Sequence, residues 1–457
     1  MRAYTALCSN LLFPLHERMK GHHTVATLRR LERSQWLDAR TIQEGQLERL
    51  KTFLASVNQH VPFYRELFRA SGFEPRSLTS AAHLQALPLL DKATIRKNFR
   101  ELISDEAGPL SRSNTGGSSG EPLIFLLGKQ RKAHDVAAKW RATRWWGVDI
   151  GDREMVIWGS PVELNAQDRL RKWRDLLFRS ELLPAFDMSE SNLDNFVDRI
   201  RRQRPKMLFG YPSALALIAG RAEERGVNLR SAGIKVAFVT SERLYEHQRS
   251  AIERVFGCDV ANGYGGRDAG FIAHQCPSGG MHVCAEDIVV EIVDANGGAL
   301  PPGEPGEIVV THMATGEFPF VRYRTGDIGT LSDGVCPCGR GLPLLKEIQG
   351  RTTDFVVASD GTMMHALALI YPVRETPGVK HFKIVQHDIH STEVRLVVSP
   401  EFTPEHAAQL QKSFRTRLGS DVDVVIQLVD RIDAERSGKY RYVVSNVAQS
   451  RSAAVAP

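Results

Sequence analysis

The spacing of apolar and polar residues changes along the chain, and each change predicts a different kind of element. Between Thr41 and Gln59 apolar residues recur at helical spacing, and Pro88–Lys97 forms a second such segment ahead of a loop rich in glycine and serine. From Asn192 onward, short apolar runs such as Ile234–Thr240 alternate with helical stretches. This alternation predicts parallel strands joined by crossover helices.

The pattern of apolar and polar residues changes again in the later part of the chain. Two apolar runs flank the turn at residues 296–298, which is typical of a hairpin. Beyond Gly350, strand-like runs surround a helix predicted over Pro404–Leu418. We therefore expect an α/β fold with a large N-terminal domain, built from parallel or mixed sheets, crossover helices and a β-rich part, followed by a small α+β C-terminal domain. The expected bounds are residues 1–350, with a helical segment over about 1–100, residues 351–446, and a flexible tail over 447–457.

Three loops are expected at one edge of the predicted parallel sheet. Such sheets bind ligands at the carboxyl ends of their strands, and the loops that follow these strands carry Tyr211, Ser241-Glu242 and Tyr264-Gly265-Gly266. We expect Trp158, Tyr211 and Gly265 to line a pocket for a small substrate. Trp158 and Tyr211 fit the role of packing aromatics equally well.

Composition excludes several classes of protein. A chain of 457 residues with 42% hydrophobic and 25% charged residues is neither disordered nor collagen-like, and its net charge is only +6. Basic residues gather in Arg169–Arg179 and Arg199–Lys206, which suit a nucleic acid, a membrane surface or a polyphosphate ligand, and also suit solvated helix faces. The sequence shows no apolar run that spans a membrane and no signal peptide, so we predict a cytoplasmic location.

A glycine- and serine-rich loop is the most distinctive candidate site. Glycines let the backbone approach a phosphate closely, and hydroxyl groups and free amides supply hydrogen-bond donors. The loop has no Gly-Lys-Ser/Thr ending and no GxGxxG pattern, so it is neither of those phosphate-binding motifs, and an ordinary flexible loop is the alternative. Its candidate residues are Thr115, Gly116, Gly117, Ser118, Ser119 and Gly120.

Four further segments offer polar side chains on predicted turns. Tyr264 suits stacking on a purine, and Asp268 suits a hard cation such as Mg2+. Asp327 follows a tight turn, where its carboxylate suits the two hydroxyls of a ribose. Arg351 lies at the predicted domain junction, and Lys439 lies on a loop near the C-terminus. Taken singly, each also fits an ordinary surface turn.

Taken in order, these segments resemble the acyl-adenylate-forming superfamily, which includes acyl-CoA synthetases and luciferases. The resemblance spans about residues 85–445. Within it, four stretches look most like the phenylacetate-CoA ligase branch and its relatives from capsular polysaccharide gene sets. They are His60–Tyr64, Gly210–Ser213, Tyr264–Gly270 and Cys336–Arg340.

The resemblance implies a role for each candidate residue. Thr115 to Gly120 are expected to wrap the β- and γ-phosphates of ATP, Asp268 to reach Mg2+, and Lys439 to complete the site. Ser241, Glu242 and Tyr264 are expected to frame the adenine, and Asp327 and Arg351 to hold the ribose. The small domain is expected to rotate near residues 351–354 between the two half-reactions. Two departures stand out: the phosphate loop lacks the lysine of many relatives, and Asp268 replaces their usual glutamate.

The cysteines fall in two clusters that suggest a metal. Cys276 lies close to His282 in sequence, and Cys336 and Cys338 share a tight turn. Three thiolates and one imidazole form a closed tetrahedral shell for a structural Zn2+. Reduced core cysteines are the alternative, and Cys284 competes with His282 as the fourth ligand; the relatives favour His282.

These inferences lead to an AMP-forming acid ligase. Such an enzyme uses ATP and Mg2+ to convert a small carboxylic acid to an acyl adenylate, and then transfers the acyl group to a thiol, taken here as CoA. A phosphopantetheine carrier protein or a sugar amine is left open as the acceptor, and so is a homodimer. The alternative of another class is a nucleotide-binding scaffold that has lost turnover. A nucleic-acid partner is not expected, because no recognised binding module is present.

Overall fold

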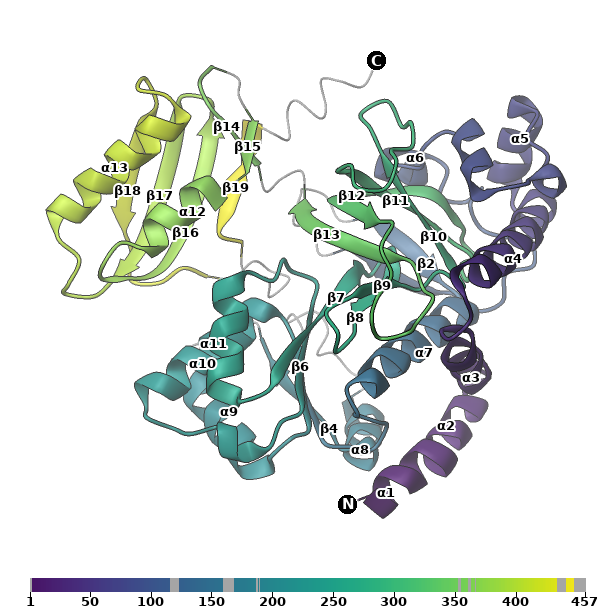
Figure 1. Cartoon of the computed structure of the whole chain (residues 1–457), viewed down its shortest axis with the longest axis horizontal. Coiled ribbons are helices and arrows are strands. Elements are labelled where there is room, and N and C mark those ends of the chain that lie inside the picture. Colours follow the sequence, from purple (N-terminus) through teal and green to yellow (C-terminus); the bar gives the residue numbers. More distant parts are fainter. Residues whose placement is uncertain are drawn as a thin grey trace. The chain divides into compact units, whose positions relative to one another are not determined.

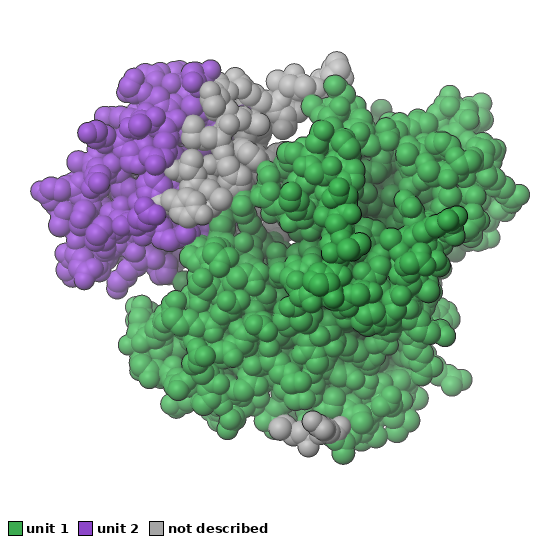
Figure 2. Space-filling view, in the orientation of Figure 1, with its two compact units in different colours: residues 1–117, 122–349 green, residues 118–121, 350–457 purple. Residues whose placement is uncertain are grey.

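The structure is a computed structural model that describes residues 2–115, 123–158, 168–185, 188, 190–351, 355–360, 363–365, 367–433 and 441–447. The chain divides into a large unit that runs up to Gln349 and a small unit that begins at Gly350 (Figure 2). The division falls where the β-rich pattern of the sequence gives way to the α+β pattern. Among the described residues, no helix combines the length and the apolar character needed to cross a membrane.

The large unit begins with a series of helices. The longest, α4 (Ala39–His60), confirms the helix predicted from the spacing of apolar residues after Thr41. It begins after Asp38, whose carboxylate accepts a hydrogen bond from the backbone amide of Thr41 at 2.9 Å, and it ends just before a proline. The other elements of this region are α1 (Arg2–Leu7), the π-helical η1 (Cys8–Leu12), α2 (Phe13–Met19), α3 (Thr24–Ser34), α5 (Pro62–Ser71), η2 (Pro75–Ser77), η3 (Ala81–Ala86) and α6 (Lys92–Lys97).

An eleven-stranded sheet forms the centre of the large unit, in the order β10-β11-β12-β13-β9-β8-β7-β6-β5-β3-β4 (Figure 1). Its strands are β3 (Glu154–Trp158), β4 (Ser180–Pro184), β5 (Met207–Gly210), β6 (Val236–Thr240), β7 (Asp259–Gly266), β8 (Gly270–Gln275), β9 (Met281–Val283), β10 (Ile288–Val293), β11 (Gly306–His312), β12 (Phe320–Ser332) and β13 (Leu344–Arg351). The five strands β4, β3, β5, β6 and β7 are parallel. The pairs β7–β8, β8–β9, β9–β13, β10–β11 and β11–β12 are antiparallel.

Crossover helices connect the parallel strands, as the alternating pattern predicts. These helices are α8 (Asp168–Phe178), α9 (Glu190–Gln203), α10 (Pro212–Glu224) and α11 (Glu246–Phe256). The sheet buries both of its faces here, because alternate residues of β6 enter different cores. Ala237 and Val239 pack with residues of α9, α10 and α11, whereas Val236 and Phe238 pack with Ala142 of α7 (Lys129–Trp145). A strand buried on both faces has to be apolar throughout, and this explains the continuous apolar run of β6.

A short antiparallel hairpin carries the ends of the glycine- and serine-rich loop. It consists of β1 (Ser111–Asn114) and β2 (Ile124–Leu127), with Asn114 opposite Ile124. The pairing continues one step further, because the amide of Thr115 donates to the carbonyl of Leu123 at 3.0 Å. Phe125, at the centre of β2, is buried in the main core of the unit and anchors the hairpin.

The small unit is an α+β domain, as expected from the sequence. Its four-stranded sheet has the order β18-β17-β16-β19, and β14 and β15 form a separate antiparallel pair. The side chains of Phe382, Ile384, Leu396 and Phe414 are buried in it. The elements are β14 (Phe355–Val357), β15 (Met363–His365), α12 (Leu367–Arg374), β16 (Val379–Asp388), β17 (Ser391–Val398), α13 (Pro404–Leu418), β18 (Asp423–Leu428) and β19 (Val443–Ser445).

Candidate active site and cysteine cluster

The predicted strand-end residues lie along one edge of the parallel sheet. Trp158 is the last residue of β3, Tyr211 follows β5, Ser241 follows β6, and Tyr264 lies near the end of β7. The ends of neighbouring strands are in register. Gly210 of β5 pairs with Val239 of β6, and Thr240 of β6 pairs with Gly263 of β7. Parallel strands in register bring their carboxyl ends to the same edge, so these separated segments become neighbours.

Tyr264 and Asp327 are in direct contact although they are far apart in the sequence. The hydroxyl of Tyr264 lies 2.9 Å from Oδ2 of Asp327 and 3.4 Å from Oγ1 of Thr325. Asp327 follows a left-handed glycine, Gly326, with φ 76°, and its amide donates to Oγ1 of Thr325 at 3.1 Å. The tyrosine of the expected adenine segment thus fixes the orientation of the carboxylate expected at the ribose.

The turn after β6 has a strained backbone. Ser241 has φ 71°, a left-handed conformation that costs a non-glycine residue about 1–3 kcal/mol and is concentrated at functional sites. The neighbouring Glu242 accepts a hydrogen bond through Oε2 from the amide of Ser213, in the first turn of α10, at 3.3 Å. Nη1 of Arg243 donates to the carbonyl of Gln349 in β13 at 2.6 Å. Contacts on both sides therefore hold this turn in place.

The aromatic residues at this edge differ in burial. The rings of Trp158 and Tyr211 stack with centroids 4.5 Å apart and an angle of 24° between their planes. Tyr211 is only 1% exposed and packs in the core beside α10, whereas Trp158 is partly exposed. Tyr211 is therefore placed as a packing aromatic, and Trp158 is the better placed of the two to meet a substrate.

Gly265 lies at a β-bulge where β7 and β8 approach closely. The register of the pair shifts between Tyr264 and Gly265. A Cβ atom at position 265 would lie 2.1 Å from the carbonyl oxygen of Gly270. The close approach of the two strands explains the absence of a side chain here, without any contribution from a substrate.

Two residues that the sequence analysis did not select hold the turn of Asp268. The hydroxyl of Tyr323 donates to Oδ2 of Asp268 at 2.6 Å, and the other carboxylate oxygen accepts the amide of Ala269 at 3.1 Å. Arg131 of α7 donates through Nη1 to the carbonyl of Asp268 at 2.9 Å and through Nη2 to that of Arg267 at 3.1 Å. A carboxylate expected to reach a cation is thus fixed by a neighbouring phenol and by a guanidinium beneath it.

Arg131 belongs to a buried network of charged groups. Its side chain is 1% exposed, and its Nε lies 3.0 Å from each carboxylate oxygen of Asp135. Burial alone would raise the pKa of Asp135, but the charge of Arg131 and the adjacent histidines hold it well below its usual range. Burial opposes the protonation of His134, yet Asp135 and Asp287 together raise its pKa. Asp287 also forms ion pairs with Arg30 of α3 and Arg49 of α4.

The same network brings His134, Asp135 and His312 close enough to suggest a metal site. Two contacts argue against one. Nδ1 of His312 accepts the amide of Ala314 at 3.3 Å, so the proton of the neutral ring is on Nε2, which then has no lone pair for a metal. Asp135 is already paired with the buried guanidinium of Arg131, which would repel a cation. The cluster is therefore a charge network that supports the Asp268 turn.

The predicted cysteine cluster is assembled in the structure. Cys276, His282, Cys336 and Cys338 each offer a ligand atom, and these four atoms lie within 4.8 Å of one another. Sγ of Cys276 lies 3.6 Å from Sγ of Cys336, and Sγ of Cys338 lies 3.2 Å from Nε2 of His282. Nδ1 of His282 lies 3.4 Å from the carbonyl of Leu342, and burial lowers the pKa of the ring to about 4, so the imidazole is neutral near neutral pH.

Cys284, the competing fourth ligand, lies outside this cluster. Its thiol accepts a hydrogen bond from Nη2 of Arg141 at 3.2 Å and lies 3.7 Å from Nδ1 of His274. Arg141 is itself buried and paired with Glu286. Of the two alternatives that the sequence left open, the geometry therefore selects His282.

The described residues include only part of the expected nucleotide-binding set. Gly116, Gly117, Ser118, Ser119, Gly120 and Lys439 lie outside the described residues, as does the side chain of Arg351. Thr115 is described at the end of the hairpin, where its Oγ1 accepts the amide of Leu123 at 2.9 Å. Its hydroxyl thus helps to close the base of the expected phosphate loop.

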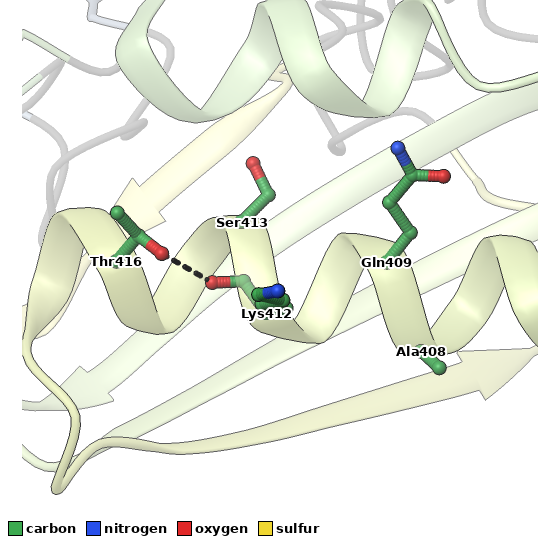
Figure 3. Close-up of a pocket in the computed structure, with 5 residues that line it drawn as sticks. All are labelled: Ala408, Gln409, Lys412, Ser413 and Thr416. Carbon is green, nitrogen blue, oxygen red and sulfur yellow. Dashed lines mark hydrogen bonds between the residues drawn. The ribbon is translucent and has the colours of Figure 1, made fainter.

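One hollow lies in the small unit and includes none of these residues. It has a volume of about 560 Å³ and is lined by five residues of α13 in the small unit: Ala408, Gln409, Lys412, Ser413 and Thr416 (Figure 3). The hydroxyl of Thr416 donates a hydrogen bond to the carbonyl of Lys412 at 2.8 Å. The hollow follows the outer face of a single helix and lacks converging polar groups, so we assign it no role.

Comparisons with known proteins agree with this arrangement. The AMP-binding enzyme family matches residues 182–316, which include Ser241, Tyr264 and Asp268, and the CapK C-terminal domain family matches residues 356–446. Protein CapK of Staphylococcus aureus is 23% identical over 88% of this chain and 89% of its own length. A phenylacetate-coenzyme A ligase of Aromatoleum evansii is 25% identical over 87% of this chain and 93% of its own length.

Solved structures show the same fold. A crystal structure of 2-hydroxyisobutyryl-CoA ligase in the postadenylation state, in complex with 2-HIB-AMP, superposes with a TM-score of 0.72. The two sequences are 20% identical, and the superposition covers 92% of each chain. Together with the two family matches and the curated relatives, this likeness identifies the chain as a member of the acyl-adenylate-forming superfamily, in the branch of CapK and the phenylacetate-CoA ligases.

Proposed function

We propose that this protein is an ATP-dependent, AMP-forming ligase that adenylates a carboxylic acid and transfers the acyl group to CoA. The observation that carries the proposal is the contact between Tyr264 and Asp327 beside the strained turn at Ser241, at the carboxyl edge of the parallel strands. This edge is where folds of this kind bind nucleotides. The names of the curated relatives and of the superposed ligase support the same chemistry.

The residues at this edge suit the nucleoside part of ATP. A carboxylate only accepts hydrogen bonds and has lone pairs for several donors, so Asp327 is suited to the two hydroxyls of a ribose while Tyr264 orients it. The ring of Tyr264 and the turn at Ser241 and Glu242 offer a flat surface and polar atoms for the adenine. We further propose that Arg351 contacts the ribose and that residues 115–120 contact the phosphates.

The first half-reaction requires positive charge near the triphosphate. A carboxylate is a weak nucleophile towards an anionic phosphate, so the enzyme has to hold the attacking oxygen in line and neutralise charge on the departing pyrophosphate. We assign Lys439 to this role, and Asp268 to holding Mg2+, which supplies positive charge at the phosphates. Tyr323 and Arg131 keep the Asp268 turn in one geometry. A cation about 4 Å from an anion, at an effective dielectric constant of about 20, contributes about 4 kcal/mol, or roughly a thousandfold in rate.

We also propose a structural Zn2+ in the cysteine cluster. The donor set suits this ion, because three sulfur atoms and one imidazole nitrogen complete a tetrahedral shell and leave no position for a reacting water. The four ligand atoms already lie within 4.8 Å of one another, and the carbonyl of Leu342 is placed to accept the other ring N–H of His282. The ligands join the end of β8 to β9 and to the turn before β13, so the ion would link these strands.

Exchange of pyrophosphate into ATP tests the proposed adenylation. The purified protein is incubated with Mg2+, ATP, labelled pyrophosphate and, one at a time, aryl, fatty, hydroxy and amino acids. Exchange that depends on one class of acid is the expected result. Tight ATP binding without exchange for any acid would instead indicate a nucleotide-binding scaffold and would refute the proposal.

A second assay separates the two half-reactions and tests the acceptor. Once an acid is known, its preformed adenylate is offered with CoA, a phosphopantetheine-bearing carrier protein or an amino sugar. We expect the thioester of CoA to form fastest. Lys439→Ala is expected to abolish exchange while it spares transfer from the preformed adenylate, because the lysine acts only on the departing pyrophosphate. Equal loss of both steps would contradict the proposed rotation of the small domain.

A further inference from the structure

The N-terminal helices carry apolar residues on two opposite faces. The inner face of the continuous helical stretch from α1 to α2 buries Cys8 and Phe13 against residues of α3 and α7. Its outer face exposes Leu7, Leu11, Leu15 and Met19, which recur every four residues and are 43%, 57%, 54% and 80% exposed. A helix that only covers a core has a polar outer face, so this outer stripe is not explained by packing within the described chain.

Helix α8, which packs against the inner face of the first helices, carries exposed apolar residues of its own. Trp173 and Leu176 are 72% and 69% exposed, and Leu177 is also exposed. These three residues have the spacing of one helix face. Helix α8 packs directly on the first helices: the carbonyl of Leu177 accepts the hydroxyl of Tyr4 at 2.9 Å, and the rings of Phe13 and Phe178 are 6.0 Å apart. Figure 1 shows α1, α2 and α8 together at the end of the large unit that carries the N-terminus.

Basic residues accompany this surface. Arg18 and Lys20 are exposed at the end of α2 beside Met19, and Nζ of Lys20 also lies 3.5 Å from Oε1 of Glu17. The sequence of α8 contains four basic and two acidic residues, and Arg174 is paired with one of the acidic ones, Asp175. The acidic residue of α2, Glu17, is buried and faces inwards. The outer face of α1 to α2 is therefore apolar along its length, with exposed basic side chains at its C-terminal end.

We propose that this surface, made of the outer faces of α1, η1 and α2 and the exposed residues of α8, docks the enzyme on an anionic lipid bilayer. Leucine and tryptophan side chains on a basic amphipathic helix are the composition of helices that lie in a membrane interface, where the apolar side chains enter the acyl boundary and the cations meet lipid phosphates. A second copy of the chain fits less well, because a two-fold interface would place basic residues against each other. The proposal does not depend on the proposed acyl transfer.

Co-sedimentation with lipid vesicles tests the docking. The full-length protein is mixed with vesicles of phosphatidylcholine alone or with added phosphatidylglycerol, at about 0.1 M and about 1 M salt, where the screening length falls from about 10 Å to about 3 Å. We expect binding to the anionic vesicles at low salt, and at least tenfold less binding to the neutral vesicles or at high salt. Equal binding to both lipids, or no binding at all, would overturn the proposal.

Matched substitutions locate the bound surface. Leu11→Glu places a charge in the apolar stripe and is expected to weaken binding at least about tenfold, as is Trp173→Ala. Arg18→Gln should weaken it about fivefold, because a basic residue near an anionic surface contributes about that factor. Lys20→Gln should weaken it less, because Lys20 is paired with Glu17. Leu428→Glu on the edge strand β18 is the control, since Leu428 is 58% exposed, much as Leu11 is, but lies in the small unit.

Two further measurements keep the result interpretable. Thermal unfolding shows whether each variant is folded, and because the substituted side chains are exposed we expect midpoints close to that of the wild type. Light scattering reports the oligomeric state without lipid. If Leu11→Glu dissociates a dimer and the wild-type protein ignores anionic vesicles, the surface belongs to a second copy and the proposal is wrong. If Leu11→Glu and Leu428→Glu bind vesicles equally, another surface is responsible.

Discussion

The two ends of strand β8 carry two sites that are held together in different ways. At its start, the Asp268 turn is fixed by groups of the protein itself, the hydroxyl of Tyr323 and the buried guanidinium of Arg131. At its end, Cys276 meets Cys336, Cys338 and His282, and the side chain of Arg340 reaches only one of these four ligands, Cys338, among the contacts of the described residues. The fold preorganises the first site, whereas the four ligand atoms of the second surround a centre that the proposed zinc ion would fill. The following predictions test this difference.

Removal of a cysteine ligand is expected to have the largest effect. Cys336→Ser should reduce bound zinc from about one ion per chain to almost none and strongly lower the unfolding temperature, because structural zinc contributes up to about 10–16 kcal/mol in small zinc-dependent peptides. Elemental analysis and thermal unfolding measure the two effects. Cys284→Ser is the control, and it should keep the metal, because Cys284 contacts Arg141 instead. Wild-type protein that purifies without metal and is not stabilised by added zinc would remove the contrast with the Asp268 turn.

Loss of the Asp268 carboxylate is expected to have the second-largest effect. Asp268→Asn keeps the size of the side chain but removes its charge, so we expect pyrophosphate exchange to fall by roughly a thousandfold, the factor for one close charge contact of about 4 kcal/mol. The unfolding temperature should change little, because the side chain is partly exposed. Exchange kinetics against Mg2+ concentration measure the effect. A variant with normal exchange would show that the carboxylate does not support the metal.

Substitution of Arg131 should affect stability and turnover together. Arg131→Met leaves the partly buried carboxylate of Asp135 without its partner, which costs at most about 3–5 kcal/mol of stability, the figure for a fully buried pair. Arg131→Lys keeps the charge but lacks the planar group that reaches both backbone carbonyls. We therefore expect the lysine variant to recover most of the stability but to need more Mg2+ for half-maximal exchange. If both variants lost stability equally and kept the wild-type Mg2+ dependence, Arg131 would have only a structural role.

The smallest effect is expected for the hydroxyl of Tyr323. Tyr323→Phe removes one hydrogen bond to a carboxylate, a contact that contributes about 1.5–3 kcal/mol, so exchange should fall about tenfold to a hundredfold. The ring is buried and its packing is kept, so the folded state should remain intact. Exchange kinetics and thermal unfolding distinguish the two contributions. An unchanged rate would mean that Arg131 alone is sufficient to hold the turn.

The sequence predicted the strand-end loops well but did not indicate what supports them. Apolar runs such as Ile234–Thr240 belong to strands buried on both faces, and their order along the chain is enough to predict a parallel sheet with ligand sites at one edge. Helix α7 has a weak signal, because its buried face mixes Arg131, His134 and Arg141 with alanines and a tryptophan. A search for apolar spacing therefore overlooks this helix and, with it, the support of Asp268.

The sequence alone was sufficient for local and ordered features: the helix after Thr41, the alternation of strands and helices, the change of pattern near residue 350, and the family resemblance carried by short motifs. The tertiary structure decided which distant groups meet. It paired Tyr264 with Asp327, selected His282 over Cys284, and buried Arg131 beneath Asp268. The physical reason is that periodicity records whether a side chain faces a core, whereas a hydrogen bond between distant polar groups depends on positions that only the folded chain brings together.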